Sequence, residues 1–143
     1  MSDTGWRPVR TRYLTAPRLG QHVVSVLLAM VAMPVFGGML WLVGAATKAS
    51  LPSVGAAIES VGVIVLYSFA ISWLGHLPLA VVLHRMLRGG QGGWLVALVA
   101  SALIGAFWAQ VLHLPIILPF AIVGGMLQAW LLRRAVLARA SLA

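Results

Sequence analysis

Glu59 is the strongest candidate for a side chain with a chemical role, because the sequence has only one other acid, Asp3. An ionisable residue in or near a membrane-spanning segment often binds an ion or relays a proton. The topology predicted from the apolar segments places Lys48, Gln110 and His113 on the same side of the membrane as Glu59. A polar cluster of these four could bind an ion or relay a proton. The alternative is that Glu59, close to the start of its span, reaches the interface and is solvated there.

The histidines raise the question of haem. His22 and His84 stand at the same level on different predicted spans, as two axial ligands do in a membrane four-helix bundle. Histidines at a membrane boundary also contact headgroups, and His76 is predicted to stand alone at intermediate depth. We predict no bound cofactor and keep His22 and His84 as candidates for haem ligands.

No other pattern in the sequence indicates catalysis. The chain has no cysteine, which excludes disulfides, thiolate metal sites and thiol catalysis. We find no nucleophile–base pair, zinc pattern or paired carboxylates. The sequence therefore predicts no catalytic residue, no metal site and no enzyme.

Composition places the chain in lipid. Apolar residues make up 62% of its 143 positions and charged residues 8%, and the mean hydropathy is +1.02. A soluble domain of this size needs far more polar surface. The net charge of +8 would suggest nucleic acid in a soluble protein. Here the arginines stand at membrane boundaries, so we expect no nucleic-acid partner.

The apolar segments predict an all-α polytopic membrane protein with four transmembrane helices in two hairpins. The expected spans are residues 22–46, 61–83, 94–112 and 116–132, each long enough to cross a hydrocarbon core of about 30 Å. Basic tails, residues 1–21 and 133–143, flank them. Residues 47–60 read as a connection. The second span has an alternative at residues 54–74, followed by an interfacial segment up to residue 87.

Proline and glycine predict bends in two spans. Pro34, Gly37 and Gly38 stand near the middle of the first span, and Pro78 stands in the second. Each proline removes an intrahelical hydrogen bond. The first group could form a hinge or a broken-helix ligand site, as in transporters. The alternative is a kink that serves packing alone.

Small residues four apart predict tight packing of the last two spans, because close backbone approach drives helix association in lipid. One row lies on the third span and one on the fourth: Ala97, Ser101, Gly105 and Ala109, and Ala121, Gly125 and Ala129. These rows should face each other and make the second hairpin the rigid unit. Gln128, near the inner end of the fourth span, is predicted to make an interhelical hydrogen bond.

The arginines predict the orientation. Nine arginines fall in the two tails and the glycine-rich connection 85–93, whereas the one lysine falls in the first connection. The positive-inside rule therefore places both tails in the cytoplasm, and a bacterial inner membrane is the expected location. The same side chains should contact anionic headgroups: Arg7, Arg10, Arg12, Arg18, Arg85, Arg88, Arg133, Arg134 and Arg139.

Small size, sparse chemistry and exposed small-residue faces favour a non-catalytic role. We expect an accessory, assembly or stabilising subunit of a larger membrane complex, with membrane-protein partners or a homo-oligomer. The alternatives are a small oligomeric transporter or ion-conducting protein that uses Glu59, and a holin-like or toxin-immunity membrane protein.

Overall fold

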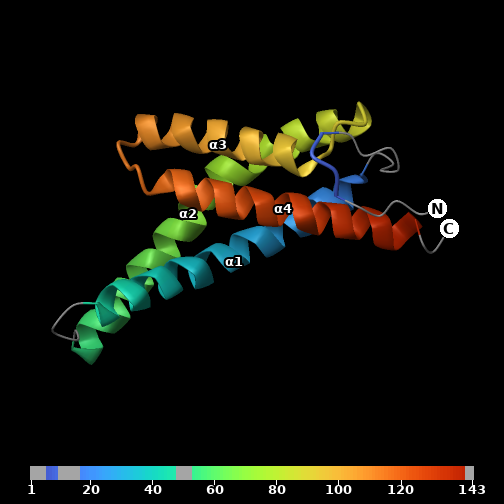
Figure 1. Ribbon diagram of the computed structural model, residues 1–143. Coiled ribbons are helices and arrows are strands. Elements are labelled where there is room, and N and C mark those ends of the chain that lie inside the picture. Colours follow the sequence, from blue (N-terminus) through green and yellow to red (C-terminus); the bar gives the residue numbers. More distant parts are fainter. Residues whose placement is uncertain (1–5, 10–16, 48–52, 141–143) are drawn as a thin grey trace.

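The computed structural model describes residues 6–9, 17–47 and 53–140, which fold into four α-helices (Figure 1). They are α1 (Leu19–Ala46), α2 (Val54–Arg88), α3 (Trp94–Val111) and α4 (Ile117–Ala140). All four are long and apolar enough to cross a membrane. The predicted all-α class with four transmembrane helices is confirmed.

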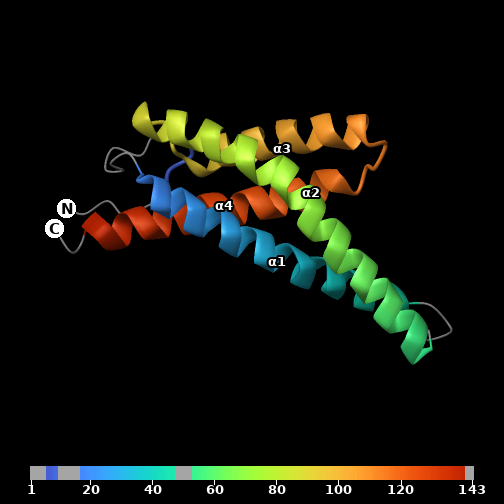
Figure 2. The ribbon, with the colours of Figure 1, turned by 180° about the vertical axis from the view of Figure 1, so that it is seen from behind.

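The helices form two hairpins, α1 with α2 and α3 with α4 (Figures 1 and 2). Helix α4 also packs against α1 and α2, and α2 packs against α3. Across the described residues α1 and α3 do not touch, so they occupy opposite corners of the bundle.

Helix α2 begins earlier than predicted. The prediction of a connection over residues 47–60 is wrong in its second half, because the helix starts at Val54 and is capped by Ser53. The Ser53 hydroxyl oxygen accepts from the N–H of Ala56 at 3.3 Å, as an N-cap side chain does. The 35-residue helix contains both alternatives for the second span. Its length of about 52 Å exceeds the hydrocarbon thickness, so the helix must tilt.

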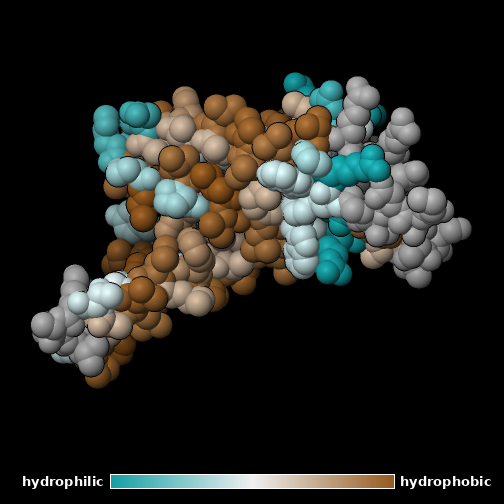
Figure 3. All heavy atoms as spheres, viewed as in Figure 1, coloured by the Kyte–Doolittle hydropathy of each residue, from teal (hydrophilic) through white to brown (hydrophobic). Residues whose placement is uncertain are grey.

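The two hairpins pack together over only part of their length. The buried residues of α1 end at Gly37, and those of α2 begin at Ser72. The described residues between these points form an arm that diverges from α3 and α4 (Figures 1 and 2). Its visible surface is mostly hydrophobic, as is the middle of the bundle (Figure 3). Such an arm needs an apolar surrounding along its whole length.

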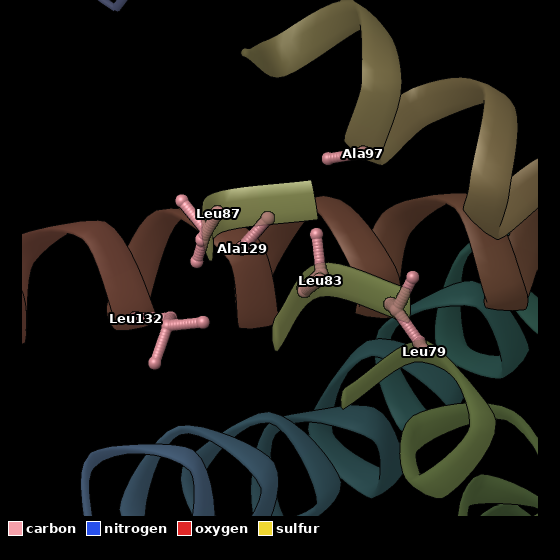
Figure 4. Close-up of a cluster of buried hydrophobic side chains, with 6 residues drawn as sticks. All are labelled: Leu79, Leu83, Leu87, Ala97, Ala129 and Leu132. Atoms are coloured by element: carbon pink, nitrogen blue, oxygen red, sulfur yellow. The ribbon is translucent and has the colours of Figure 1, made fainter. Parts of the chain in front are cut away.

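The packed core lies at the opposite end from the arm. Side chains from three helices form it (Figure 4), namely Leu79, Leu83, Leu87, Ala97, Ala129 and Leu132. The described arginines of α2, α4 and the segments before α1 gather at this end of the bundle (Figure 1). The described parts of the three predicted basic segments therefore share one end of the molecule. Which compartment that end faces stays a prediction.

The α3–α4 hairpin is built on close contacts between small residues. A Cβ added at Gly105 would lie 2.6 Å from the Cβ of Ala121. A Cβ added at Gly125 would lie 2.7 Å from the Cβ of Ser101 and 2.9 Å from Leu79. Real Cβ atoms do not approach so closely, so the two rows of small residues face each other and leave no space for a larger side chain.

The turn of this hairpin depends on His113. Its φ of 53° is left-handed, a conformation that usually falls to glycine at the residue after a helix cap. The N–H of His113 donates to Gln110 at 3.3 Å, and that of Leu114 donates to Ala109 at 3.0 Å. These two bonds close the end of α3 as a Schellman motif. His113 thus has a structural role, because its left-handed backbone conformation ends α3.

The glycine-rich connection after α2 has a defined structure, although the sequence suggests a flexible loop. Gly90, at φ 71°, ends α2 in the same motif: its N–H donates to Leu87, and the next N–H donates to Met86. Each of these carbonyls would otherwise lack a partner at the helix end.

Residues 6–9 cap the start of α3. The N–H groups of residues 93–95 donate to the carbonyl oxygens of residues 7–9 over 3.0 to 3.2 Å. These N–H groups have no partner inside their own helix. A Cβ added at Gly93 would overlap the carbonyl group of Pro8. Gly93 therefore allows the two backbone segments to meet.

Trp6 anchors this capping segment. Its ring packs against the core between α2, α3 and α4, and the guanidinium of Arg133 lies 5.9 Å from the ring centroid. The segment that precedes the helices is thereby part of the folded bundle, at least over residues 6–9.

Candidate functional site

A cavity of about 410 Å³ lies where the arm diverges from the rest of the bundle. All four helices contribute to its wall, which is mostly aliphatic and aromatic. Pockets for small molecules have volumes of about 300–1,000 Å³ and combine apolar walls with few polar groups. The cavity is therefore the best candidate for a functional site in the described part of the chain.

His76 of α2 is the key polar residue of this wall. Only 5% of it is exposed. Its Nδ1 lies 2.6 Å from the Oε1 of Gln128 on α4, and the Gln128 amide Nε2 donates to the His76 carbonyl at 3.2 Å. Gln128 is fully buried. The predicted interhelical hydrogen bond of Gln128 is confirmed, and its partner is His76.

This double contact fixes the tautomer of His76. The Gln128 nitrogen is committed to the His76 carbonyl, so its oxygen faces Nδ1. An amide oxygen only accepts hydrogen bonds, so Nδ1 must carry the proton. In the neutral ring Nε2 then presents a lone pair. Nε2 has no hydrogen-bond partner among the described residues.

Glycine gives the ring of His76 its space. A Cβ added at Gly124 would lie 3.2 Å from the Nε2 atom and 2.9 Å from the sulfur of Met33. Any larger residue at position 124 would therefore displace the imidazole or the methionine. The pair Gly124–Gly125 thus serves two purposes: Gly125 admits Ser101, and Gly124 admits His76.

Two serine hydroxyls of the wall are already hydrogen-bonded, whereas the hydroxyls of Tyr67 and Ser68, which also line it, make no hydrogen bond among the described residues. Ser72 donates to the carbonyl of Ser68, and Ser101 donates to that of Ala97 at 2.6 Å. Each donor is thus used within its own helix, as is common for serine in apolar helices. His76 Nε2 is the ring nitrogen of the wall that accepts no hydrogen bond from the described residues.

Trp108 of α3 lines the cavity and supplies a hydrogen bond that α2 lacks. Pro78 cannot donate to the carbonyl of Leu74, which stands four residues before it. The indole N–H of Trp108 donates to that carbonyl instead, at 2.9 Å. Helix α2 continues through Pro78 and changes direction along its length (Figure 2). In lipid a freed carbonyl needs such a partner.

Helix α1 likewise continues through Pro34. Gly37, three residues later, packs against Ile64 and Ser68 of α2.

The candidate haem ligands are in direct contact. His22 Nε2 lies 3.1 Å from His84 Nδ1, and the rings are edge-to-face with centroids 5.2 Å apart. His22 Nδ1 is buried without a hydrogen-bond partner among the described residues. The two rings do share a level, as predicted. They would have to separate to admit a haem iron between them.

The structure does not bring the proposed polar cluster together. Glu59 is exposed on the arm, whereas Gln110 and His113 are exposed at the end of α3. Within the described ranges the side chains of these three make no hydrogen bond or ion pair with one another, and the one bond between Gln110 and His113 is the backbone bond of the turn. Figure 1 shows the tip of the arm well apart from the α3–α4 turn. Lys48 lies outside the described residues.

The arginines predicted to contact lipid have varied surroundings. Arg134 lies over the Trp130 ring at 4.9 Å, Arg18 caps α1, and Arg85 and Arg88 are exposed. Arg10, Arg12 and the side chain of Arg139 lie outside the described part. Contact with headgroups stays a prediction for all of them.

Sequence reasoning missed His76 and Trp108 as site residues. A signal existed for His76, since polar residues within apolar spans tend to form hydrogen bonds across helices. Gln128 was already expected to need such a partner on another helix. For Trp108 the signal was Pro78, whose freed carbonyl requires a donor. Neither signal says which helix supplies the partner.

The chain shows no match to a known protein family, to a curated protein or to a solved structure. The functional conclusion therefore depends on the site and the fold alone.

Proposed function

We propose that this protein is a non-catalytic integral membrane protein that acts as an accessory subunit of a larger membrane complex. The supporting observation is the arm. Within its described residues it has no buried side chain, and its two helices pack against each other alone at the tip (Figures 1 and 2).

The surface of the arm suits a helical partner. A Cβ added at Gly55 or at Gly62 would meet nothing within 4 Å. These two glycines stand seven residues apart and so lie on one face of α2. Exposed small residues let a second helix approach the backbone closely. The sparse chemistry of the chain agrees with this role: the described residues hold no cluster of three metal-ligating side chains.

Site-specific cross-linking tests this proposal with two equally exposed leucines. Leu66 on the arm is 68% exposed, and Leu103 on α3 is 67% exposed. A photoreactive amino acid at each position, in membranes of the native host, should give one protein adduct from position 66 and none from position 103. That adduct should co-purify with the wild-type chain at a constant ratio in mild detergent.

Two results would contradict the accessory role. One is the absence of a protein adduct at position 66. The other is an adduct with a second copy of this chain, which would favour self-assembly and hence the transporter alternative. Proton or ion flux in liposomes that disappears in Glu59→Gln would also support that alternative.

A further inference from the structure

We propose that the cavity binds a neutral hydrophobic molecule with a hydroxyl head, of the class of long-chain alcohols, and that His76 Nε2 accepts the hydroxyl hydrogen. The proposal is independent of the accessory role and rests on His76, Gln128 and the cavity wall.

The wall specifies a neutral and largely apolar ligand. Among the described residues, no arginine, lysine or acid lines the cavity. A charged head would therefore be placed in an apolar site without a counter-ion, which is costly. Aliphatic and aromatic side chains from all four helices would surround the hydrocarbon chain, among them Ile71, Ile104 and Phe120.

His76 specifies a donor on the ligand. Gln128 holds Nδ1 as a donor, so Nε2 offers a lone pair. Ser72 and Ser101 donate to backbone carbonyls, and no described residue donates to Nε2. A ligand donor at Nε2 would add a hydrogen bond to an otherwise apolar contact. A hydroxyl group is the neutral head that supplies one donor here, whereas an ester or ether supplies none.

The position of the cavity gives such a ligand a route. It lies where the arm leaves the bundle, and the surfaces on either side are hydrophobic (Figure 3). A molecule dissolved in the bilayer would reach this region through largely hydrophobic surroundings. His76 and Leu79 line the cavity, and Leu79 also belongs to the packed core.

Photolabelling in phosphatidylcholine nanodiscs tests the proposal with two probes. One is a long-chain alcohol with a diazirine in its chain, and the other is its methyl ether, which lacks the donor. In the wild type the alcohol should label cavity residues about three- to tenfold more than the ether, as one neutral hydrogen bond predicts.

Three variants make the test specific. His76→Phe should reduce alcohol labelling to the ether level. Gly75→Leu should abolish labelling by both probes, because Gly75 lines the cavity and has room for a side chain. Gly44→Leu is the matched control: this glycine of α1 also has room for a side chain but lies outside the wall. It should label as the wild type does.

The proposal is overturned if the two probes label the wild type equally, or if Gly44→Leu loses labelling as Gly75→Leu does. It is also overturned if folded His76→Phe keeps the preference for the alcohol. Should His76→Phe fail to fold, as size-exclusion chromatography would reveal, the wild-type preference and the two glycine variants decide the outcome.

Discussion

The bond between Trp108 and the Leu74 carbonyl shows how a single residue sets the course of a helix. Pro78 removes the donor that Leu74 would find within α2. The indole of α3 replaces it, and this links the bend of α2 to the neighbouring hairpin. One hydrogen bond thus connects the bend of α2 to Trp108, a residue of the cavity wall.

A double-mutant cycle measures this link. Trp108→Phe should lower the free energy of unfolding in detergent by about 1–3 kcal/mol, because it leaves a carbonyl unsatisfied. In a Pro78→Ala background the same change should cost clearly less, since the new N–H at position 78 can bond to Leu74. Equal costs in both backgrounds would show that the indole bond does not compensate for the proline.

For single residues, the sequence indicated which side chains need an interhelical hydrogen bond, but it did not indicate which residue would be the partner. Gln128 stands out as a polar residue in an apolar run, and its interhelical bond could be foreseen. The identity of His76 as its partner could not, because relative depth depends on the bend and tilt of α2. The capping role of Gly93 was equally hidden, since it requires a segment distant in the chain to lie against it.

Among the elements, the α3–α4 hairpin is the one that the sequence describes best. Small residues four apart specify which faces meet, and the short turn leaves no other antiparallel arrangement. The start of α2 was harder. Pro52 followed by Ser53 is a helix-start signal, but the apolar run that follows carries Glu59, which suggested a boundary there instead.

Bulky substitutions should separate this hairpin. Gly105→Leu and Gly125→Leu should each lower the melting temperature in detergent, because even a Cβ at these positions meets Ala121 or Ser101 too closely. Gly62→Leu, where nothing lies within 4 Å, should leave it nearly unchanged. An equal melting temperature for all three variants would contradict the observed packing.

The whole molecule is polarised, with the described arginines at one end and the apolar arm at the other (Figure 1). Composition and charge positions foresaw this polarity, because lipid admits few arrangements of four spans. They did not foresee the divergence of the hairpins, which depends on the unequal lengths and bends of α1 and α2.

Cysteine labelling tests the predicted orientation, and the chain offers a cysteine-free background. Ser2→Cys, Gly89→Cys and Ser141→Cys should react with a membrane-impermeant maleimide from the cytoplasmic side only. Ser53→Cys and Leu114→Cys should react from the opposite side. Labelling of positions 2 and 89 from different sides would refute the four-span topology.

The cap that residues 6–9 place on α3 has a consequence for biogenesis. Residues 6–9 are synthesised before α1 to α4, yet their docking site exists only once α3 is in the membrane. While α1 and α2 are being inserted, residues 6–9 therefore have no docking site. Their docking would be a late step that attaches the segment before α1 to the second hairpin, and so joins the two hairpins after both have been inserted.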